Sequence, residues 1–272
     1  MYEAYFGLRE KAFRKTPDPR YLFLNETYEE ALARLLFAVE EREIGLLTGE
    51  IGSGKTLLSR VLVDRLGDGW EVAMIVNPRL SPRQLLKAVA RELDIAEPAA
   101  HAADLVDQLQ ARLFELDQAG RAVLLIIDEA HLVPSRATFE ELRLLTNVQL
   151  DDRSLLALIL LGQTELRRRL KHRTYRALTQ RLGADFHLGT FSPQDTSAYV
   201  RHRLAVAGGR RDDIFTDEAL ARLHQASGGV PRVLNHLATQ CLLEVMALGG
   251  SQVTADVAQA VVSSLDFVEE GH

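Results

Sequence analysis

The sequence predicts an α/β protein in which a five-stranded parallel sheet is followed by a small all-helical domain. Over the first 190 residues, five short apolar runs alternate with helical patterns, as in a parallel sheet with helices on both faces. After Ser192 no strand pattern remains, and helix-start signals follow one another. The 272 residues are 47% hydrophobic and 26% charged, which is enough for a sizeable core and typical of a soluble globular protein.

The expected elements follow in chain order. Strands are expected at 44–48, 72–76, 123–127, 155–161 and 185–188, and helices at 26–41, 55–66, 81–93, 103–119, 138–146 and 165–181. The region up to Asn25 is aromatic and is expected to be irregular. Helices of the tail begin at Ser192-Pro193, Thr216, Pro231 and Thr254. We therefore expect two domains, an α/β domain over 1–190 with the aromatic N-terminal segment, and a helical domain over 191–272.

Bulk charge and cysteine content limit the function classes. The formal net charge is −6, so the whole surface does not attract nucleic acid or anionic lipid, and such binding would need a local basic patch. Cys241 is the only cysteine and lies in an apolar helical stretch, which fits a buried thiol in a reducing compartment. The longest uncharged apolar run, 154–164, is too short to span a bilayer, and no signal peptide is visible. We expect a cytoplasmic protein.

A phosphate-binding loop lies between the first strand and the next helix. Gly49-Glu50-Ile51-Gly52-Ser53-Gly54-Lys55-Thr56 fits G-x-x-x-x-G-K-[ST], and it follows a strand and opens a helix as the mechanism requires. The glycines let backbone N–H groups point at phosphates, and the helix N-terminus adds positive potential. Lys55 is expected on the β- and γ-phosphates and Thr56 on Mg²⁺, which predicts an ATP site.

Two acids follow the third strand. The run 123–127 is continuously apolar, as in a central strand buried on both faces, and Asp128 and Glu129 come directly after it. Ligands bind such sheets at the carboxyl ends of the strands. We expect Asp128 to hold Mg²⁺ through water and Glu129 to act as general base on the attacking water. His131, next but one, is expected to be a loop residue.

Polar residues end two more strands. Gln163 follows the strand at 155–161 and is expected either to sense the γ-phosphate or to cap the next helix. Asn77 follows the second strand and is expected either to hold Glu129 inactive through a hydrogen bond or to form a turn before Pro78.

Arginines supply the remaining candidates. The segment 167–181 holds seven Lys or Arg residues, most of which are expected on a solvated helical face. Arg181, just before the last strand, is the first candidate for an arginine that acts on a neighbouring subunit's nucleotide, with Arg173 and Arg176 as rivals. Arg232, in the first turn of a tail helix, is unfavourable for the helix dipole and is expected to contact phosphate.

The chain resembles the AAA+ ATPases of the ExeA/GspA type, from bacterial secretion and pilus biogenesis. The resemblance rests on Tyr5-Phe6-Gly7-Leu8 with Thr16-Pro17-Asp18-Pro19, the 48–56 loop, the segments 141–147 and 161–166, and Gly229-Val230-Pro231-Arg232. It implies a five-stranded AAA+ core, a helical lid and assembly into rings or filaments. It also implies that Gln163 and Arg232 are the two sensors and that Arg181 is the arginine finger.

Two function classes stay open at this point. One is an oligomeric ATPase subunit of a secretion or pilus-type envelope machine, acting through an unidentified protein partner. The other resembles the TniB/MuB/TnsC transposition ATPases, which form ATP-dependent filaments on duplex DNA. The aromatic N-terminal segment favours the first class on resemblance. Secretion members carry a transmembrane helix and a periplasmic domain after the ATPase, and this chain reaches His272 without either, which favours the second class or a soluble pilus-type member. For DNA, the candidate contacts are the 167–181 cluster and Arg201, Arg203, Arg210 and Arg211.

Overall fold

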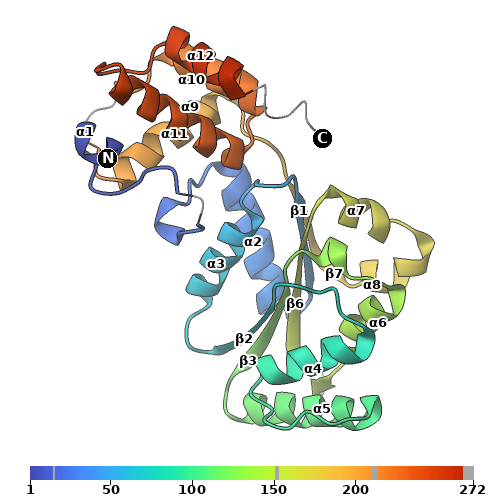
Figure 1. Cartoon of the computed structure of the whole chain (residues 1–272). Coiled ribbons are helices and arrows are strands. Elements are labelled where there is room, and N and C mark those ends of the chain that lie inside the picture. The colour runs from blue at the N-terminus through green and yellow to red at the C-terminus, as the bar shows by residue number, and fades with distance from the viewer. Residues whose placement is uncertain (15, 151–152, 210–212, 266–272) are drawn as a thin grey trace. The chain divides into compact units, whose positions relative to one another are not determined.

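The computed structural model describes residues 1–14, 16–150, 153–209 and 213–265 (Figure 1). Its contacts form two compact units. The sheet unit consists of residues 26–49 and 58–188, and the helical unit consists of residues 1–25 and 50–57 with the described residues from Gly189 onward. The N-terminal segment and the phosphate loop thus share their contacts with the tail helices. The division into domains at residue 190 stays a prediction.

The sheet unit is built on five parallel strands. Across the sheet they run in the order β2 (Trp70–Ile75), β3 (Ala122–Ile127), β6 (Leu156–Gly162), β1 (Ile44–Gly49) and β7 (Leu182–Leu188). The predicted five-stranded parallel sheet is confirmed. Strands β1, β3 and β6 are buried along their whole length, which explains why their sequences are continuously apolar. These three strands are neighbours, so their carboxyl ends meet at one edge of the sheet.

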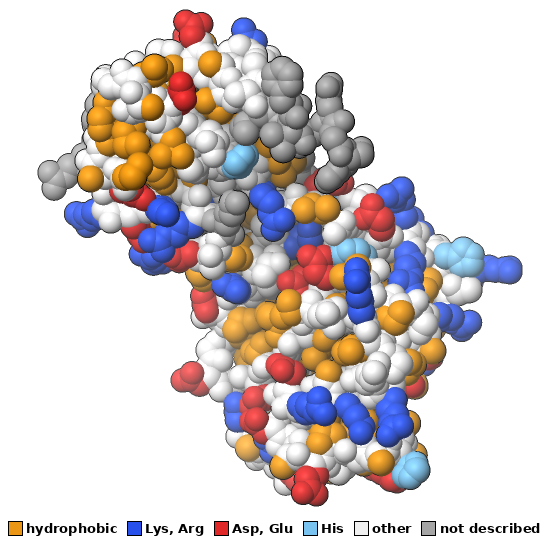
Figure 2. Space-filling view, in the orientation of Figure 1, with side chains coloured by type: hydrophobic (Ala, Val, Ile, Leu, Met, Phe, Trp, Pro, Cys, Tyr) orange, Lys and Arg blue, Asp and Glu red, His pale blue; other side chains and the backbone are white. Residues whose placement is uncertain are grey.

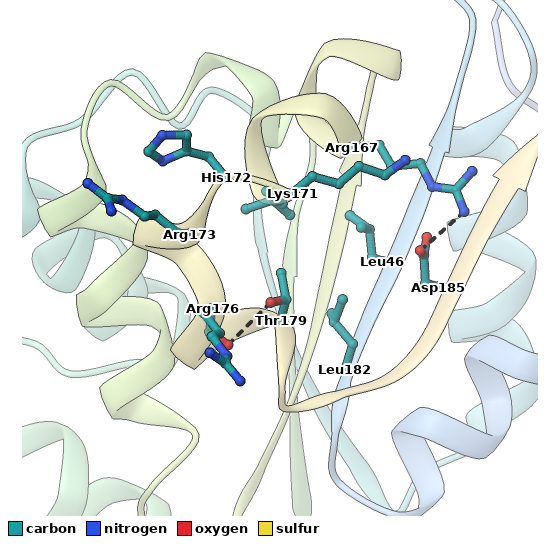
Figure 3. A pocket seen from close by; sticks show the side chains of 10 residues that line it. Leu46, Arg167, Lys171, His172, Arg173, Arg176, Thr179, Leu182 and Asp185 are labelled. Atoms are coloured by element: carbon teal, nitrogen blue, oxygen red, sulfur yellow. Dashed lines mark hydrogen bonds and ion pairs between the residues drawn. The ribbon is translucent and has the colours of Figure 1, made fainter.

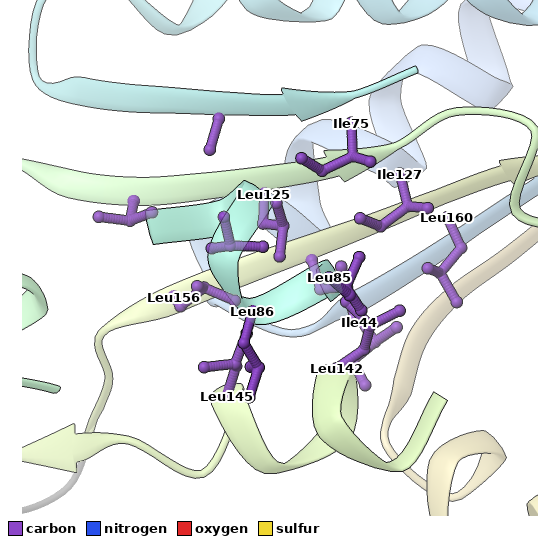
Figure 4. Packing of buried hydrophobic residues seen from close by; sticks show 14 of the residues in the cluster. Ile44, Ile75, Leu85, Leu86, Leu125, Ile127, Leu142, Leu145, Leu156 and Leu160 are labelled. Atoms are coloured by element: carbon purple, nitrogen blue, oxygen red, sulfur yellow. The ribbon is translucent and has the colours of Figure 1, made fainter. Parts of the chain in front are cut away.

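One face of the sheet packs against α4 (Pro82–Glu92), α5 (Ala102–Gln118), α6 (Arg136–Leu145) and α7 (Thr164–Leu170) in a single apolar cluster. Figure 4 shows Leu85 of α4 and Leu142 of α6 facing strand residues such as Ile127 and Leu160. All four side chains are fully buried. Burying such a side chain contributes about 1.5–3 kcal/mol, so this layer holds the strand ends rigidly.

The helix α2 (Glu26–Glu40) packs against β1 and β7. Gly45 of β1 allows α2 to approach, because a Cβ there would lie 3.3 Å from Leu35 Cδ2 of α2, and it also leaves room for Ile159 of β6, whose Cδ1 would be 2.5 Å away. The helix α3 (Lys55–Leu66) begins directly after the phosphate loop, with the bounds expected from the sequence.

The helical unit contains α9 (Pro193–Val206), α10 (Asp217–Ser227), α11 (Pro231–Ala247) and α12 (Ala255–Leu265). The four expected helix starts are observed. The Ser192 side chain accepts a hydrogen bond from the Asp195 backbone N–H in a capping box, and Thr216 caps α10. None of the helices among the described residues is both long and apolar enough to cross a bilayer.

The aromatic N-terminal segment packs within this unit and contains a short helix α1 (Tyr2–Tyr5) and a 3₁₀ turn η1 (Pro19–Tyr21). Its anchor is Arg203 of α9, which is 5% exposed. The Arg203 guanidinium donates to the Ala12 carbonyl (2.7 Å) and the Tyr199 hydroxyl (3.1 Å), and it lies 4.5 Å from the centre of the Tyr21 ring. Arg203 is therefore a buried structural residue. Its assignment to a DNA-binding patch was wrong.

The elements expected from the sequence differ from the observed ones mainly around the basic segment 167–181. The expected helix over 165–181 is broken, since α7 ends at Leu170 and is followed by the 3₁₀ turn η3 (Arg173–Tyr175) and α8 (Arg176–Thr179). The His172 side chain accepts the Thr174 backbone N–H, and this local hydrogen bond replaces a helical one. Strand β7 starts three residues earlier than expected, and a short hairpin of β4 (Gln149–Leu150) and β5 (Arg153–Ser154) was not foreseen.

Candidate nucleotide-binding site

The phosphate loop has the backbone that its glycines permit. Gly52 and Gly54 have φ values of 81° and 91°, in the left-handed region where a side chain is disfavoured. The loop closes on itself, because Ser53 N donates to the Glu50 carbonyl (3.2 Å). The Lys55 ammonium, 7% exposed, donates to the same carbonyl (2.9 Å) and lies 3.5 Å from Ser53 Oγ. Its positive charge is thus held over the loop, where a phosphate oxygen would be a stronger acceptor than a carbonyl.

Arg232 lies against this loop in the helical unit. A Cβ on Gly52 would be 2.4 Å from Arg232 Cβ, so the first turn of α11 contacts the loop backbone directly. Arg232 itself is exposed, and the preceding Gly229 (φ 74°) accommodates the Phe191 carbonyl at a distance that no side chain would allow. The structure therefore brings the loop and the predicted sensor Arg232 together.

Asp128 and Glu129 follow β3 at the edge where the carboxyl ends of the central strands meet. Asp128 is 4% exposed, and its Oδ1 accepts the Glu129 backbone N–H (2.8 Å). Glu129 has φ 51° and ψ 38°, a left-handed conformation that is uncommon outside glycine.

Gln163 and His131 lie beside these acids. Gln163 occupies the N-cap position of α7, but its side chain makes no capping hydrogen bond, so the alternative of a helix cap is not supported. Its backbone N–H donates to His131 Nδ1 (3.4 Å). His131, in the 3₁₀ turn η2 (Ala130–Leu132), also lies 3.3 Å from Glu129 Oε2. Nothing in the sequence foresaw that His131 would touch both candidates.

The contacts of Asn77 support the second of its two expected roles, a turn before Pro78. Its Oδ1 accepts the Arg79 backbone N–H (3.4 Å), which is a local turn of the kind Asn forms before proline. Asn77 is exposed, and among the described residues it has no recorded contact with Glu129. A role in holding Glu129 stays a prediction.

Some Lys and Arg side chains of the basic segment 167–181 form hydrogen bonds or ion pairs, and others do not. Lys and Arg side chains gather over α7 and α8 (Figure 2). Arg167 pairs with Asp185 (3.2 Å) and Arg168 with Glu165 (3.2 Å), while Arg169 donates to the Val133 carbonyl. Arg181 Nη1 donates to Thr146 Oγ1 (3.3 Å). Among the described residues, no hydrogen bond or ion pair engages the side chains of Lys171, Arg173 and Arg176.

These three cations line a pocket of about 470 Å³ with Leu46 and Leu182 at its floor. In Figure 3, Lys171 extends toward Arg167, whereas His172 and Arg173 point away from Leu46. The positive groups therefore diverge and do not form one anion site within the chain. The structure leaves Arg173 and Arg176 unpaired and exposed, and gives Arg181 a partner, so the choice among the three stays open.

The donor set fits magnesium. Mg²⁺ takes oxygen ligands, commonly one or two from the protein and the rest from phosphates and water. The Thr56 hydroxyl and the Asp128 carboxylate supply oxygen. Among the residues that the structure describes, no group of three or more His, Cys, Asp or Glu side chains could hold a metal by itself.

Comparison with known proteins agrees with this arrangement. The AAA domain family matches residues 39–170. The chain is 39% identical over 275 residues to General secretion pathway protein A of Aeromonas hydrophila, and the match covers the whole chain. This chain is a GspA-like AAA+ protein. It spans half the length of that relative, so the relative's full activity and partners do not transfer directly.

Solved structures show the same fold. The ORC2 protein of Aeropyrum pernix matches with a TM-score of 0.70 and 17% identity, covering 93% of this chain and 71% of that chain. The RuvB Holliday junction branch migration motor of Thermotoga maritima matches with a TM-score of 0.60 and 20% identity, covering 89% and 70%. At these identities the likeness concerns the fold alone, and it confirms the α/β P-loop AAA+ class.

A polar contact next to the loop was also not foreseen. Thr48, fully buried at the end of β1, lies with its Oγ1 3.0 Å from Nδ1 of His187 on β7. The contact ties the strand that leads into the loop to the edge strand. A signal existed, since Thr48 is the single hydroxyl in an otherwise apolar strand and needs a partner when buried.

Proposed function

We propose that the chain binds ATP with Mg²⁺ and hydrolyses it. The observation that carries the proposal is the loop of Gly49 to Thr56, which starts where β1 ends, with one strand, β6, between β1 and the strand that precedes Asp128 and Glu129. Lys55 and the loop N–H groups bind the β- and γ-phosphates. Thr56 and Asp128 hold Mg²⁺, which neutralises charge on the phosphates. Glu129 accepts a proton from the attacking water, and Gln163 and Arg232 contact the γ-phosphate.

The first test is nucleotide binding by Lys55→Ala. Removing the ammonium takes away the counter-ion of the β- and γ-phosphates, so affinity for a non-hydrolysable ATP analogue should be nearly lost in isothermal titration. Lys11→Ala removes an exposed lysine elsewhere and is the matched control, with affinity unchanged. Equal affinity of the Lys55→Ala protein and the parent would refute the loop assignment.

The proposal includes oligomerisation. Gln163, Arg232 and Glu129 act within one chain, whereas Arg181, Arg173 or Arg176 acts on the nucleotide of a neighbouring copy. Such an arginine contributes about 10³-fold or more to turnover where it has been measured. Each should be replaced by Ala in turn. The variant that binds ATP normally but hydrolyses it poorly identifies the residue.

Mixing decides whether that arginine acts in trans. A mixture of the defective arginine variant with Glu129→Gln contains interfaces that pair an intact arginine with an intact Glu129. We therefore expect activity in the mixture that neither protein has alone. A mixture as inactive as its components, or parent turnover that does not depend on protein concentration, would refute a shared site.

For its biological role, we propose an ATPase subunit of a secretion or pilus-type envelope machine that works through a protein partner in the cytoplasm. The support is the similarity of this whole chain to half of General secretion pathway protein A. Cytoplasmic location rests on the single cysteine, Cys241, which is buried and unpaired.

A DNA-bound regulator is the alternative, and one observation favours it. Lys171, Arg173 and Arg176 form an exposed basic surface over η3 and α8 in an otherwise acidic chain. The second expected patch is weaker, since Arg203 is buried and Arg201 pairs with Asp217, while Arg210 and Arg211 lie outside the described residues. Gel shifts of duplex DNA with ATP, ADP and no nucleotide, at two salt concentrations, separate the roles. An ATP-dependent, salt-sensitive shift supports the alternative, and its absence at low salt removes it.

A further inference from the structure

His131 lies between the proposed general base and the end of β6. Its Nδ1 is 3.4 Å from the backbone N of Gln163, which donates to it, and 3.3 Å from Glu129 Oε2. The His131 side chain is only 13% exposed, so water does not readily replace either contact. One ring nitrogen thus faces a hydrogen-bond donor and an acceptor at similar distances.

The two contacts exclude each other. A neutral imidazole carries a proton on one nitrogen only. If Nδ1 is unprotonated, it accepts the Gln163 N–H and presents a lone pair to the Glu129 carboxylate. If Nδ1 carries the proton, it donates to Glu129 Oε2 and leaves the Gln163 N–H without this acceptor. The state of the β6 end and the state of the carboxylate are therefore linked through a single atom.

Glu129 shows the first of these two states. Its Oε2 is buried and has no hydrogen-bond partner among the described residues, although Nδ1 is 3.3 Å away. Its backbone is also held in the left-handed region (φ 51°), a strained conformation that persists only where the surroundings fix it. A strained backbone with an unsatisfied carboxylate oxygen marks a group kept available for another proton donor.

We propose that His131 is a positioning residue that couples the end of β6 to Glu129. While the Gln163 backbone occupies Nδ1, the Glu129 carboxylate is free to accept a proton from water. When Gln163 moves away from Nδ1, the imidazole loses its Nε2 proton to solvent and takes up a proton from solvent at Nδ1, and His131 then donates a hydrogen bond to Glu129 and withdraws it from water. The inference rests on the proposed ATPase activity and adds to it a link between the γ-phosphate sensor and the base.

The test compares two replacements of His131. His131→Phe keeps the ring volume but removes Nδ1, so Glu129 can no longer be withdrawn from water, and we expect kcat to rise about fivefold or more while KM and the affinity for a non-hydrolysable ATP analogue stay within about threefold of the parent. His131→Asn places an amide near the Nδ1 position, where it can accept from Gln163 or donate to Glu129, and should retain kcat within about threefold. His101→Phe changes an exposed histidine at the start of α5 and should leave both constants unchanged.

A second background separates positioning from a general structural effect. In Glu129→Gln protein the base is absent, so adding His131→Phe should change the residual rate by less than about twofold. A fall in kcat, an equal change in both backgrounds, a change that appears in KM instead of kcat, or an equal change for Asn and Phe would overturn the inference. The thermal midpoint of each variant shows whether it is folded, and the Asn variant keeps the comparison valid if the Phe variant is destabilised. A parent protein without ATP hydrolysis would overturn both proposals, whereas an active parent whose kcat is unchanged in the His131→Phe variant overturns only this one.

Discussion

Gly52→Ala perturbs the contact between the phosphate loop and α11. Gly52 has φ 81°, and an added Cβ would lie 2.4 Å from Arg232 Cβ, closer than two carbon atoms can approach without a shift. The substitution leaves Lys55, Thr56 and the carboxylates unchanged. It therefore isolates the fit between the loop and the first turn of the helix.

The expected magnitude has two parts. A side chain in the left-handed region costs about 1–2 kcal/mol. Relieving the contact needs a backbone shift of the loop or of α11, which we take as about 1 kcal/mol more, in the range of small overpacking effects. Because the loop must keep its shape around the phosphates, we expect these 2–3 kcal/mol to appear in nucleotide binding, as a loss of about 30- to 150-fold in affinity.

Isothermal titration with a non-hydrolysable ATP analogue measures this loss, and Arg232 offers a matched pair of second changes. Arg232→Gly removes the Cβ that the methyl group added by Gly52→Ala would contact. The loss of affinity caused by Gly52→Ala should therefore be smaller in the Arg232→Gly background than in the parent. Arg232→Ala keeps the Cβ and should give no such recovery. Equal behaviour of the two pairs, or parent affinity in Gly52→Ala, would refute the reasoning.

Three further predictions concern the helical unit. Arg203→Ala should lower the free energy of unfolding by about 2–3 kcal/mol in urea titration, because the Ala12 carbonyl loses its partner inside the protein. Arg201→Ala on the same helix removes an exposed ion pair and should change the free energy of unfolding by about 0.5 kcal/mol or less. Burial, and then the charge of Arg203, lower the pKa of His202, so the unfolded chain binds a proton at this residue more readily than the folded protein. The free energy of unfolding should therefore fall as pH drops below about 6.5, and this fall should be smaller in His202→Gln. Burial raises the pKa of Cys241 to about 12, so the thiol should resist alkylation at pH 8 in the native protein and react after denaturation, and rapid native labelling would contradict its burial.

The sheet was predictable because its central strands carry a strong signal. The run Ala122–Ile127 is apolar at every position because both faces are covered, and the glycines of the phosphate loop occur where only glycine fits. Strand β7 is an edge strand with exposed and half-buried residues, so its start at Leu182 left little trace in the sequence. The break of the helix after Leu170 depends on one local hydrogen bond of His172, which no periodicity reveals.

The candidate site was predictable where a local motif defines it, and less so where it depends on distant contacts. Lys55, Asp128 and Glu129 are each identified by the strand that precedes them. His131 could be placed only by the register of β3 with β6, which brings Gln163 to its Nδ1 from 32 residues away. Arg203 looked like a surface cation, because its partner Ala12 is 191 residues distant in the chain.

The most direct test of the account is a comparison of ATP binding and phosphate release in Glu129→Gln protein. With the base removed and Asp128 retained at Mg²⁺, the variant should bind ATP as tightly as the parent but release phosphate more slowly by about 10²-fold or more. It should also accumulate as an ATP-bound oligomer in size-exclusion chromatography. Phosphate release at the parent rate would show that Glu129 is only a structural acid and would contradict the mechanism proposed for this AAA+ protein.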